Sequence, residues 1–292
     1  MLKKKISKVL LSAASFLFMA ATSGGKPVAQ QNFSSIPSCD TTLHKPEYNK
    51  HAFDTDGLCI CLPELDSSQL LVAPRIQLNK HAGQFVTNYL KEEGFFLNKI
   101  KAKSPNYFKI IDAVFNQYDI PVELKYLAVI ESKLNNNISS PVGAAGLWQF
   151  MPTTARQFGL KVSGKNDDRK QTYKSTVAAA KCLIYLHRIF DDWLLTIAAY
   201  NSGPGYVLSA IKKSGSRNFW ALQNYLPMET RKHVKKFIAM HYYFEGHGSL
   251  TTLTKSETKA HISAVAVFIE TNKENKIPLT DSISIETVKG YK

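Results

Sequence analysis

The strongest constraint on the fold is a helical spacing of apolar residues that runs, with interruptions, from about residue 76 to residue 245. Apolar residues at intervals of three and four mark one face of a helix, and that face has to be buried. Gly and Pro break the pattern into separate helices. The sequence therefore predicts a mainly α-helical domain over residues 73–248. The expected helices are 85–96, with a turn at Gly94, and 107–118, 121–131, 173–190, 192–200, 204–212 and 230–245.

Composition supports a folded chain. Of the 292 residues, 44% are hydrophobic, which is enough apolar mass for a real core and excludes wholesale disorder. No segment repeats at a fixed period, so collagen-like and solenoid designs are excluded as well.

The first 29 residues have the order of a secretory signal peptide. Four lysines precede an apolar run from Val9 to Ala21, and small residues follow. A run of 13 residues is too short to span a bilayer comfortably. No cysteine lies near the expected cut, so the chain is not an evident lipoprotein. We expect a soluble, exported protein that is periplasmic or associated with the cell envelope.

The net charge indicates an anionic partner or, alternatively, solubility alone. Removing the five lysines before residue 30 lowers the formal charge from +14 to +9. Export argues against nucleic acid as the partner. An anionic cell-wall polymer or a membrane surface fits the compartment better.

Four cysteines in an oxidising compartment allow three full pairings. We expect Cys39 to pair with Cys59 or Cys61 in an irregular lead-in over 30–72, and Cys182 to stay buried and reduced. A zinc site in the lead-in is conceivable, but its spacing lacks the paired Cys-x-x-Cys form of common zinc folds. We therefore expect no metal and no cofactor.

Residues 249–292 form a polar C-terminal extension. It holds one strand-like run, Ile262–Ile269, and a weaker one near 283–288. The pattern fits either a small β appendage or a partly ordered tail.

Glu131 is the first candidate for chemistry. On a helix, the residues three, four and seven positions before it share its face, and all three are apolar: Ala128, Leu127 and Leu124. Burial beside such a stripe raises the pKa of a carboxyl group, so that it can act as a general acid near neutral pH. The alternative is a glutamate at a helix end that reaches water.

Two further segments carry the residue types of a sugar site. A loop of small residues, 140–146, allows a close approach of its backbone to a ligand and leads into Leu147-Trp148-Gln149-Phe150-Met151-Pro152. The segment Ala198–Gly203 places Tyr200 and Asn201 at a helix end. Taken singly, such aromatic residues are more often core than ligand.

The ordered set of these motifs resembles the soluble-lytic-transglycosylase (SLT) domain. The motifs are Glu131-Ser132, Ser140, Gly143–Pro152 and Ala198–Gly205. Phe219-Trp220 and Leu226–Arg231 are similar to the membrane-bound lytic murein transglycosylase D branch. The resemblance covers about residues 73–245.

The resemblance implies a lysozyme-like, mainly α-helical domain that acts on peptidoglycan glycan strands. We expect a monomer that uses no cofactor. The family cleaves the β-1,4 bond between N-acetylmuramic acid and N-acetylglucosamine and leaves a 1,6-anhydro end. By resemblance, Glu131 is the acid and then the base. Substrate contacts are expected from Ser140, Gln149 and Asn201, a nearby hydroxyl group from Tyr200, and an apolar wall from Met151.

Ordinary glycoside hydrolysis would need a second carboxylate. Each candidate has a structural explanation, such as an Asp168–Arg169 ion pair or a helix cap at Asp192. A hydrolytic muramidase and a non-catalytic peptidoglycan-binding protein remain the alternatives. The candidates for this second carboxylate are Asp167, Asp168, Asp191, Asp192 and Glu229.

Three departures from the family pattern stand out. No LysM wall-binding repeat occurs in 246–292. His233-Val234-Lys235-Lys236 stands where relatives usually have Tyr-Val-Pro-Lys, and Gln171-Thr172 stands where an Asp-Pro pair is usual. We expect none of these departures to touch Glu131.

Overall fold

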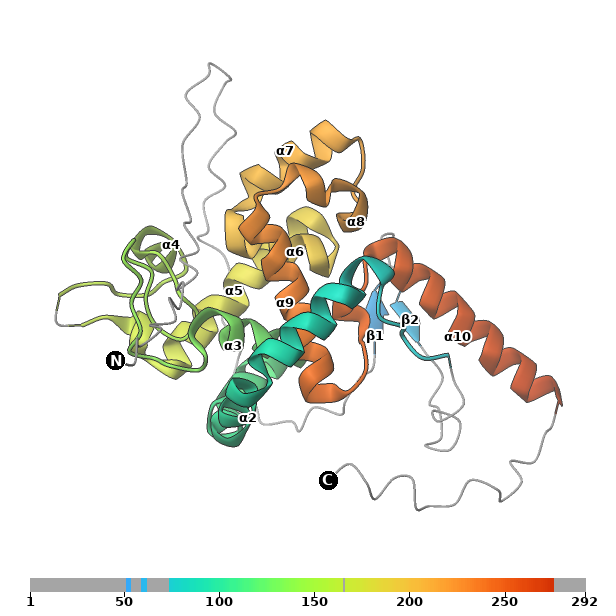
Figure 1. Cartoon of the computed structure of the whole chain (residues 1–292), viewed down its shortest axis with the longest axis horizontal. Helices are drawn as coiled ribbons and strands as arrows, with labels where there is room; N and C mark the ends of the chain where they lie inside the picture. The colour runs from blue at the N-terminus through green and yellow to red at the C-terminus, as the bar shows by residue number, and fades with distance from the viewer. Residues whose placement is uncertain (1–50, 54–58, 62–73, 165, 276–292) are drawn as a thin grey trace, which may run out of the picture. The chain divides into compact units, whose positions relative to one another are not determined.

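The computed structural model describes residues 51–53, 59–61, 74–164 and 166–275 (Figure 1). Two units are distinguished, and the one that contains Val72–Lys292 holds all of the described helices, which confirms the prediction of a mainly α-helical domain. Its α-helices are α2 (Lys80–Gln117), α3 (Tyr126–Ser132), α4 (Pro152–Gln157), α5 (Thr172–Phe190), α6 (Trp193–Ser202), α7 (Pro204–Ser214), α8 (Phe219–Leu222), α9 (Met228–Glu245) and α10 (Lys255–Asn275). Short 3-10 turns lie at Val122–Lys125, Asp168–Lys170, Gln223–Tyr225 and Leu250–Thr252.

The other unit contains a short hairpin. Strand β1 (His51–Phe53) pairs antiparallel with β2 (Cys59–Cys61), with Ala52 opposite Ile60. The expectation of an irregular lead-in is therefore wrong for these two segments. The expected signal peptide and Cys39, and with them the expected cysteine pairing, lie outside the described residues.

Helix α9 organises the core of the helical unit, because α2, α3 and α6 all pack against it (Figure 1). Helix α6 is buried along almost its whole length, from Leu194 to Ser202. A helix that is apolar all round has to be surrounded by other elements, as α6 is by α5, α7 and α9. Residues far apart in the sequence are thereby brought together on α3, α6 and α9.

Helix α2 corrects the prediction of two helices separated by a turn at Gly94. The helix continues through Gly94, where nothing lies within 4 Å of an added Cβ, and through Pro105. Proline has no N–H group to bond the carbonyl oxygen four residues back, which is that of Lys101. The Ser104 hydroxyl group donates to this oxygen instead, at 2.9 Å, so the helix survives.

The other predicted helices are confirmed, with shifted ends. The segment predicted as 121–131 is a 3-10 turn followed by α3, and α5, α6, α7 and α9 correspond to the remaining four. The Asp192 carboxylate accepts from the Leu195 N–H group at 3.0 Å, which confirms it as the cap of α6. Cys182 is buried on α5 and unpaired, as predicted. The short helices α4 and α8 were not predicted.

The C-terminal extension is helical over Lys255–Asn275, which includes the strand-like run Ile262–Ile269, so the alternative of a β appendage is wrong for this segment. The second weak run lies outside the described residues. Helix α10 is held at its start, where the Lys255 N–H group donates to Asp192 at 2.6 Å. Glu257 binds the Trp220 indole N–H group (3.2 Å) and the Asn79 amide (2.5 Å). These contacts join α10 to α6, α8 and the start of α2.

The loop between α3 and α4 is held by a buried arginine. Arg169 donates from Nη1 to the carbonyl oxygens of Gly143 (2.7 Å) and Phe150 (2.9 Å). Its Nε and Nη2 atoms donate to both carboxylate oxygens of Asp167. The predicted Asp168–Arg169 pair is therefore wrong: Asp168 bonds Lys174 at 2.8 Å instead. Neighbours in sequence point in different directions, and the fork of the guanidinium group fits Asp167.

The structure predicts that Gly146→Ala strongly destabilises the fold. Gly146 has φ +82°, and an added Cβ would lie 1.8 Å from the Arg169 carbonyl oxygen. Gly159→Ala is the matched control, because Gly159 has φ +90° but open space around it. We expect a loss of about 1–2 kcal/mol for the control, from backbone strain alone, and about 3 kcal/mol or more for Gly146→Ala. Urea unfolding measures both, and equal losses would contradict the close contact.

Candidate active site

Helix α3 ends directly after Glu131 in an unusual backbone. Lys133 and Leu134 both have positive φ values, +52° and +56°, which non-glycine residues adopt at a cost. The Ser132 hydroxyl group supports this turn by donating to the Ala128 carbonyl oxygen and accepting from the Asn135 N–H group. The turn buries Leu134 and keeps the Glu131 side chain directed toward α9.

The Glu131 side chain is only 4% exposed. Its Oε1 atom is buried and has no hydrogen-bond partner among the described residues. Burial raises the pKa of Glu131 to about 8, because a carboxylate there would lose its hydration. The carboxyl group is therefore protonated at neutral pH, as a general acid must be. The alternative of a glutamate that reaches water is excluded.

His233 on α9 faces this acid, with Nε2 at 3.6 Å from Glu131 Oε1. The imidazole is 1% exposed, and its Nε2 also has no hydrogen-bond partner in the described part of the chain. Burial lowers the pKa of His233 to about 3, and the charge of Lys236 acts in the same direction. At neutral pH the contact thus joins two neutral groups and is no ion pair.

The position of His233 corrects one expectation. The His233–Lys236 segment was expected not to touch Glu131, yet it supplies both a contact and a charge to this residue. Lys236 lowers the pKa of Glu131 and Glu229 raises it, although both effects are smaller than that of burial. Glu229 and Lys236 also pair with each other at 3.5 Å.

Most of the other candidate carboxylates have structural partners. Asp167 binds Arg169, Asp168 binds Lys174, and Asp191 binds Lys255 at 2.6 Å. Of the five candidates, all of which lie among the described residues, only Glu229 shifts the pKa of Glu131 through its charge.

Asn201, at the end of α6, also has a buried polar atom without a hydrogen-bond partner among the described residues. Its Oδ1 accepts from the Thr230 hydroxyl group at 2.8 Å, whereas Nδ2 is buried without a partner in the described residues. Thr230 therefore fixes which way the amide points and leaves its donor free. A buried donor of this kind suits a ligand, because leaving it unpaired costs free energy.

The remaining predicted site residues are placed as follows. The Tyr200 hydroxyl group donates to the Trp148 carbonyl oxygen at 2.8 Å. Burial, and then the charge of Glu131, raise the pKa of Tyr200 well above its usual range, so the phenol lies within electrostatic reach of the acid. Met151 is half-buried just before α4.

Ser140 and Gln149 bond within their own loop. Ser140 Oγ accepts from the Ala144 N–H group at 3.0 Å, and Gln149 Nε2 donates to the Gly146 carbonyl oxygen at 2.8 Å. Gln149 also has a positive φ, +48°. Trp148 is core: it is 1% exposed and its indole donates to Thr176.

His233 and Thr230 are the site residues that the sequence analysis missed. The signal for His233 was its departure from the family pattern, and the signal for Thr230 was its place in the Leu226–Arg231 motif. Among the described residues, no group of three or more His, Cys, Asp or Glu side chains is arranged to hold a metal ion.

Comparison with known proteins identifies the class. Residues 110–223 match the family model of the transglycosylase SLT domain. The chain therefore carries an SLT domain, the family that its motifs indicated. The match includes Glu131 and Asn201 and ends ten residues before His233.

Two relatives in sequence agree with this class. The chain is 35% identical over 206 residues to "Membrane-bound lytic murein transglycosylase D" of Escherichia coli (strain K12). This match covers 69% of this chain and 42% of that relative. It is 31% identical over 121 residues to the "Soluble lytic murein transglycosylase" of the same strain, covering 39% of this chain and 19% of the relative. The solved structure of the 70-kDa soluble lytic transglycosylase from Escherichia coli matches at 28% identity, with a TM-score of 0.42, over 50% of this chain and 26% of that one. The chain thus spans less than half the length of each.

The buried acid predicts a pH-dependent stability. Below about pH 4.5 Glu131 is protonated both folded and unfolded; as pH rises toward 8, only the unfolded chain releases the proton. The contribution of Glu131 to the free energy of unfolding therefore falls across this window, by up to about 1.4 kcal/mol per pH unit. Glu131→Gln cannot titrate, so we expect its stability relative to the unmodified chain to increase from pH 5 to pH 8.

Urea unfolding at pH 5, 6, 7 and 8 measures the difference. Glu92→Gln, on the exposed side of α2, controls for the loss of one carboxyl group. A constant difference between Glu131→Gln and the unmodified chain would show that the acid is not buried as described.

Proposed function

We propose that the protein is a peptidoglycan lytic transglycosylase, a carbon–oxygen lyase that cleaves the β-1,4 bond between N-acetylmuramic acid and N-acetylglucosamine. The observation that carries the proposal is the burial of the Glu131 carboxyl group, which is 4% exposed, within the stretch that matches the SLT domain family. A glycosidic oxygen is a poor leaving group unless it is protonated as the bond breaks. An acid that keeps its proton up to about pH 8 meets this need.

One glutamate serves both halves of the reaction. Glu131 gives its proton to the glycosidic oxygen, the C1–O bond breaks, and positive charge develops on the muramic acid ring. The resulting carboxylate takes the proton of the C6 hydroxyl group, whose oxygen bonds to C1 and closes the 1,6-anhydro ring. No water is consumed, and the acid is regenerated.

The free donor of Asn201 supports a contact to the sugar near the cleaved bond. Ser140 Oγ accepts a hydrogen bond within the loop, and its hydroxyl hydrogen is left to donate to the sugar. Gln149 donates within the loop through Nε2, and its amide oxygen is left to accept from the sugar. Tyr200 orients the acid or the substrate, and Met151 provides an apolar wall.

A hydrolytic muramidase is the second candidate, because Glu229 acts electrostatically on Glu131. In that reaction a second carboxylate would activate water or attack the sugar. The ion pair of Glu229 with Lys236 favours a structural role instead. The remaining alternative, a wall-binding protein without activity, does not explain why a carboxyl group is kept buried.

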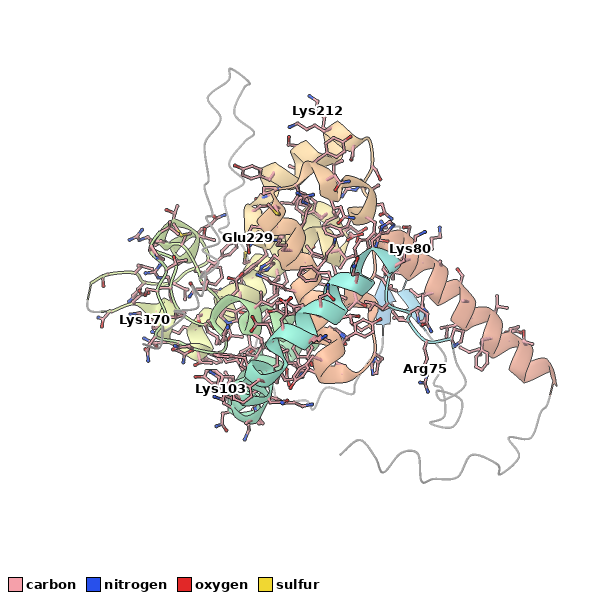
Figure 2. The ribbon with its side chains drawn as sticks, in the orientation of Figure 1. Arg75, Lys80, Lys103, Lys170, Lys212 and Glu229 are labelled. Carbon is pink, nitrogen blue, oxygen red and sulfur yellow. The ribbon has the colours of Figure 1, made fainter. Side chains whose placement is uncertain are left out.

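We place the protein in the cell envelope as a monomer, held to peptidoglycan or to an anionic membrane surface by its basic surface. The described part of the chain contains no helix that is long and apolar enough to cross a membrane. Exposed lysines are spread over α2, the 3-10 turn Asp168–Lys170 and α7 of the helical unit rather than gathered in one cluster (Figure 2). Such a spread favours weak contact with an extended anionic polymer. The labelled lysines are Lys80, Lys103, Lys170 and Lys212.

Mass spectrometry of digested peptidoglycan tests the reaction type. We expect the purified protein to release muropeptides that are lighter by one water than hydrolysed ones, and Glu131→Gln to release none. Circular dichroism and wall binding confirm that the variant is folded. Reducing-end products from the unmodified protein would indicate the muramidase, and no products with intact wall binding would indicate the binding protein.

Glu229→Gln separates the two enzymatic readings. If Glu229 only adds negative charge beside the acid, its loss lowers the pKa of Glu131, so the alkaline limb of kcat/KM moves to lower pH while anhydro products persist. Lys232→Gln, on an exposed part of the same helix, is the control. Loss of turnover at every pH, with the fold intact, would instead make Glu229 a second catalytic carboxylate.

A further inference from the structure

The contact between His233 and Glu131 is incomplete as it stands. Two buried polar atoms, His233 Nε2 and Glu131 Oε1, face each other at 3.6 Å, and neither has a hydrogen-bond partner among the described residues. Leaving both unpaired costs more than pairing them. A small rotation of either side chain closes the gap, and catalytic hydrogen bonds are often long before substrate is bound.

The protonation states decide which way this hydrogen bond runs. Glu131 is protonated and His233 is neutral at neutral pH, for the reasons of burial given above. A neutral imidazole can donate from Nε2 or accept there. If it accepted the acid's proton, that proton would point away from the substrate. Donation from Nε2 to Oε1 leaves Oε2 to carry the proton that the reaction uses.

Donation also serves the second half of the reaction. Once Glu131 has given up its proton, the same N–H group bonds a carboxylate, which strengthens the bond without any movement of His233. His233 itself need not titrate. A proton relay through the imidazole is disfavoured, because the imidazolium would be a buried cation beside Lys236.

The titratable groups near His233 and Glu131 lie on α6 and α9. Tyr200 on α6 lies within electrostatic reach of Glu131, and Glu229 and Lys236 lie on α9, the helix of His233 itself. On α9, positions 229, 233 and 236 share one face. None of these three neighbours forms a hydrogen bond with His233 Nε2.

We propose that His233 is a positioning residue whose neutral imidazole donates a hydrogen bond from Nε2 to Oε1 of Glu131 and so directs Oε2 to the glycosidic oxygen. The inference rests on the proposed function for its catalytic meaning, whereas the contact itself does not. It also gives a physical role to a departure from the family pattern, in which a tyrosine usually stands at this position. A phenol can donate a hydrogen bond to a carboxyl group as an imidazole can.

Three variants test the proposal: His233→Phe removes the donor and keeps an aromatic ring, His233→Gln keeps an N–H donor, and His233→Tyr supplies the hydroxyl group of the relatives. We expect His233→Phe to lower kcat about 100-fold with little change in KM. We expect His233→Gln or His233→Tyr to restore most of the activity.

A second measurement is independent of turnover. Carbon-13 labelling of glutamate side chains in the full chain, with Glu131→Gln to assign the signal, follows the titration of Glu131 by NMR. Because a donor stabilises the carboxylate, His233→Phe should move this titration about one pH unit higher, and His233→Gln should move it back.

The outcomes separate the two proposals. An unchanged Glu131 titration in His233→Phe, or losses of activity that only follow the folded fraction in all three variants, would overturn the positioning role. A shifted titration in a protein whose unmodified form yields no anhydro products would support the hydrogen bond and overturn the lytic transglycosylase.

Discussion

The burial of one carboxyl group between α3 and α9 is the constraint on which the rest of the site depends. Two elements enclose the Glu131 carboxyl group: α3 supplies buried apolar residues before it, and α9 supplies the neutral imidazole of His233 opposite it. Charged neighbours only adjust the effect, since Lys236 and Glu229 act in opposite directions. The fold thus keeps the Glu131 carboxyl group protonated at neutral pH, where a carboxyl group exposed to water would be ionised.

Two devices hold the acid and the following loop in a fixed relation. The left-handed residues after Ser132 turn the chain sharply, and Arg169 ties two carbonyl oxygens of the loop to a 3-10 turn. Gly146 is needed there because the backbone of Arg169 lies against it. Ser140 and Gln149 form hydrogen bonds within this loop, and we propose that the same two side chains also contact the sugar. A substitution of either residue would therefore affect both the loop structure and substrate binding.

Much of the fold could be predicted because most of its helices are marked by patterns within their own sequence. The apolar spacing located α5, α6 and α9, and the cap at Asp192 was readable from one residue. Helix α2 was misjudged because Gly94 and Pro105 are local breakers, while the Ser104 hydroxyl group and the packing on α9 are not visible in local pattern. The strand-like run Ile262–Ile269 is helical, and the sequence could not show this because a short apolar run fits either a strand or a helix.

The acid was predictable and its partner was not, and the difference is one of distance along the chain. The apolar face of Glu131 can be counted on its own helix, whereas His233 comes to it across more than a hundred residues. The pKa shifts of Glu131 and His233 together define a pH range in which both side chains are neutral. Glu131 keeps its proton below about pH 8 and His233 stays neutral above about pH 3. Between these limits the pair holds one charge state, so an imidazole placed here behaves as a fixed donor rather than as the pH switch that histidine usually provides.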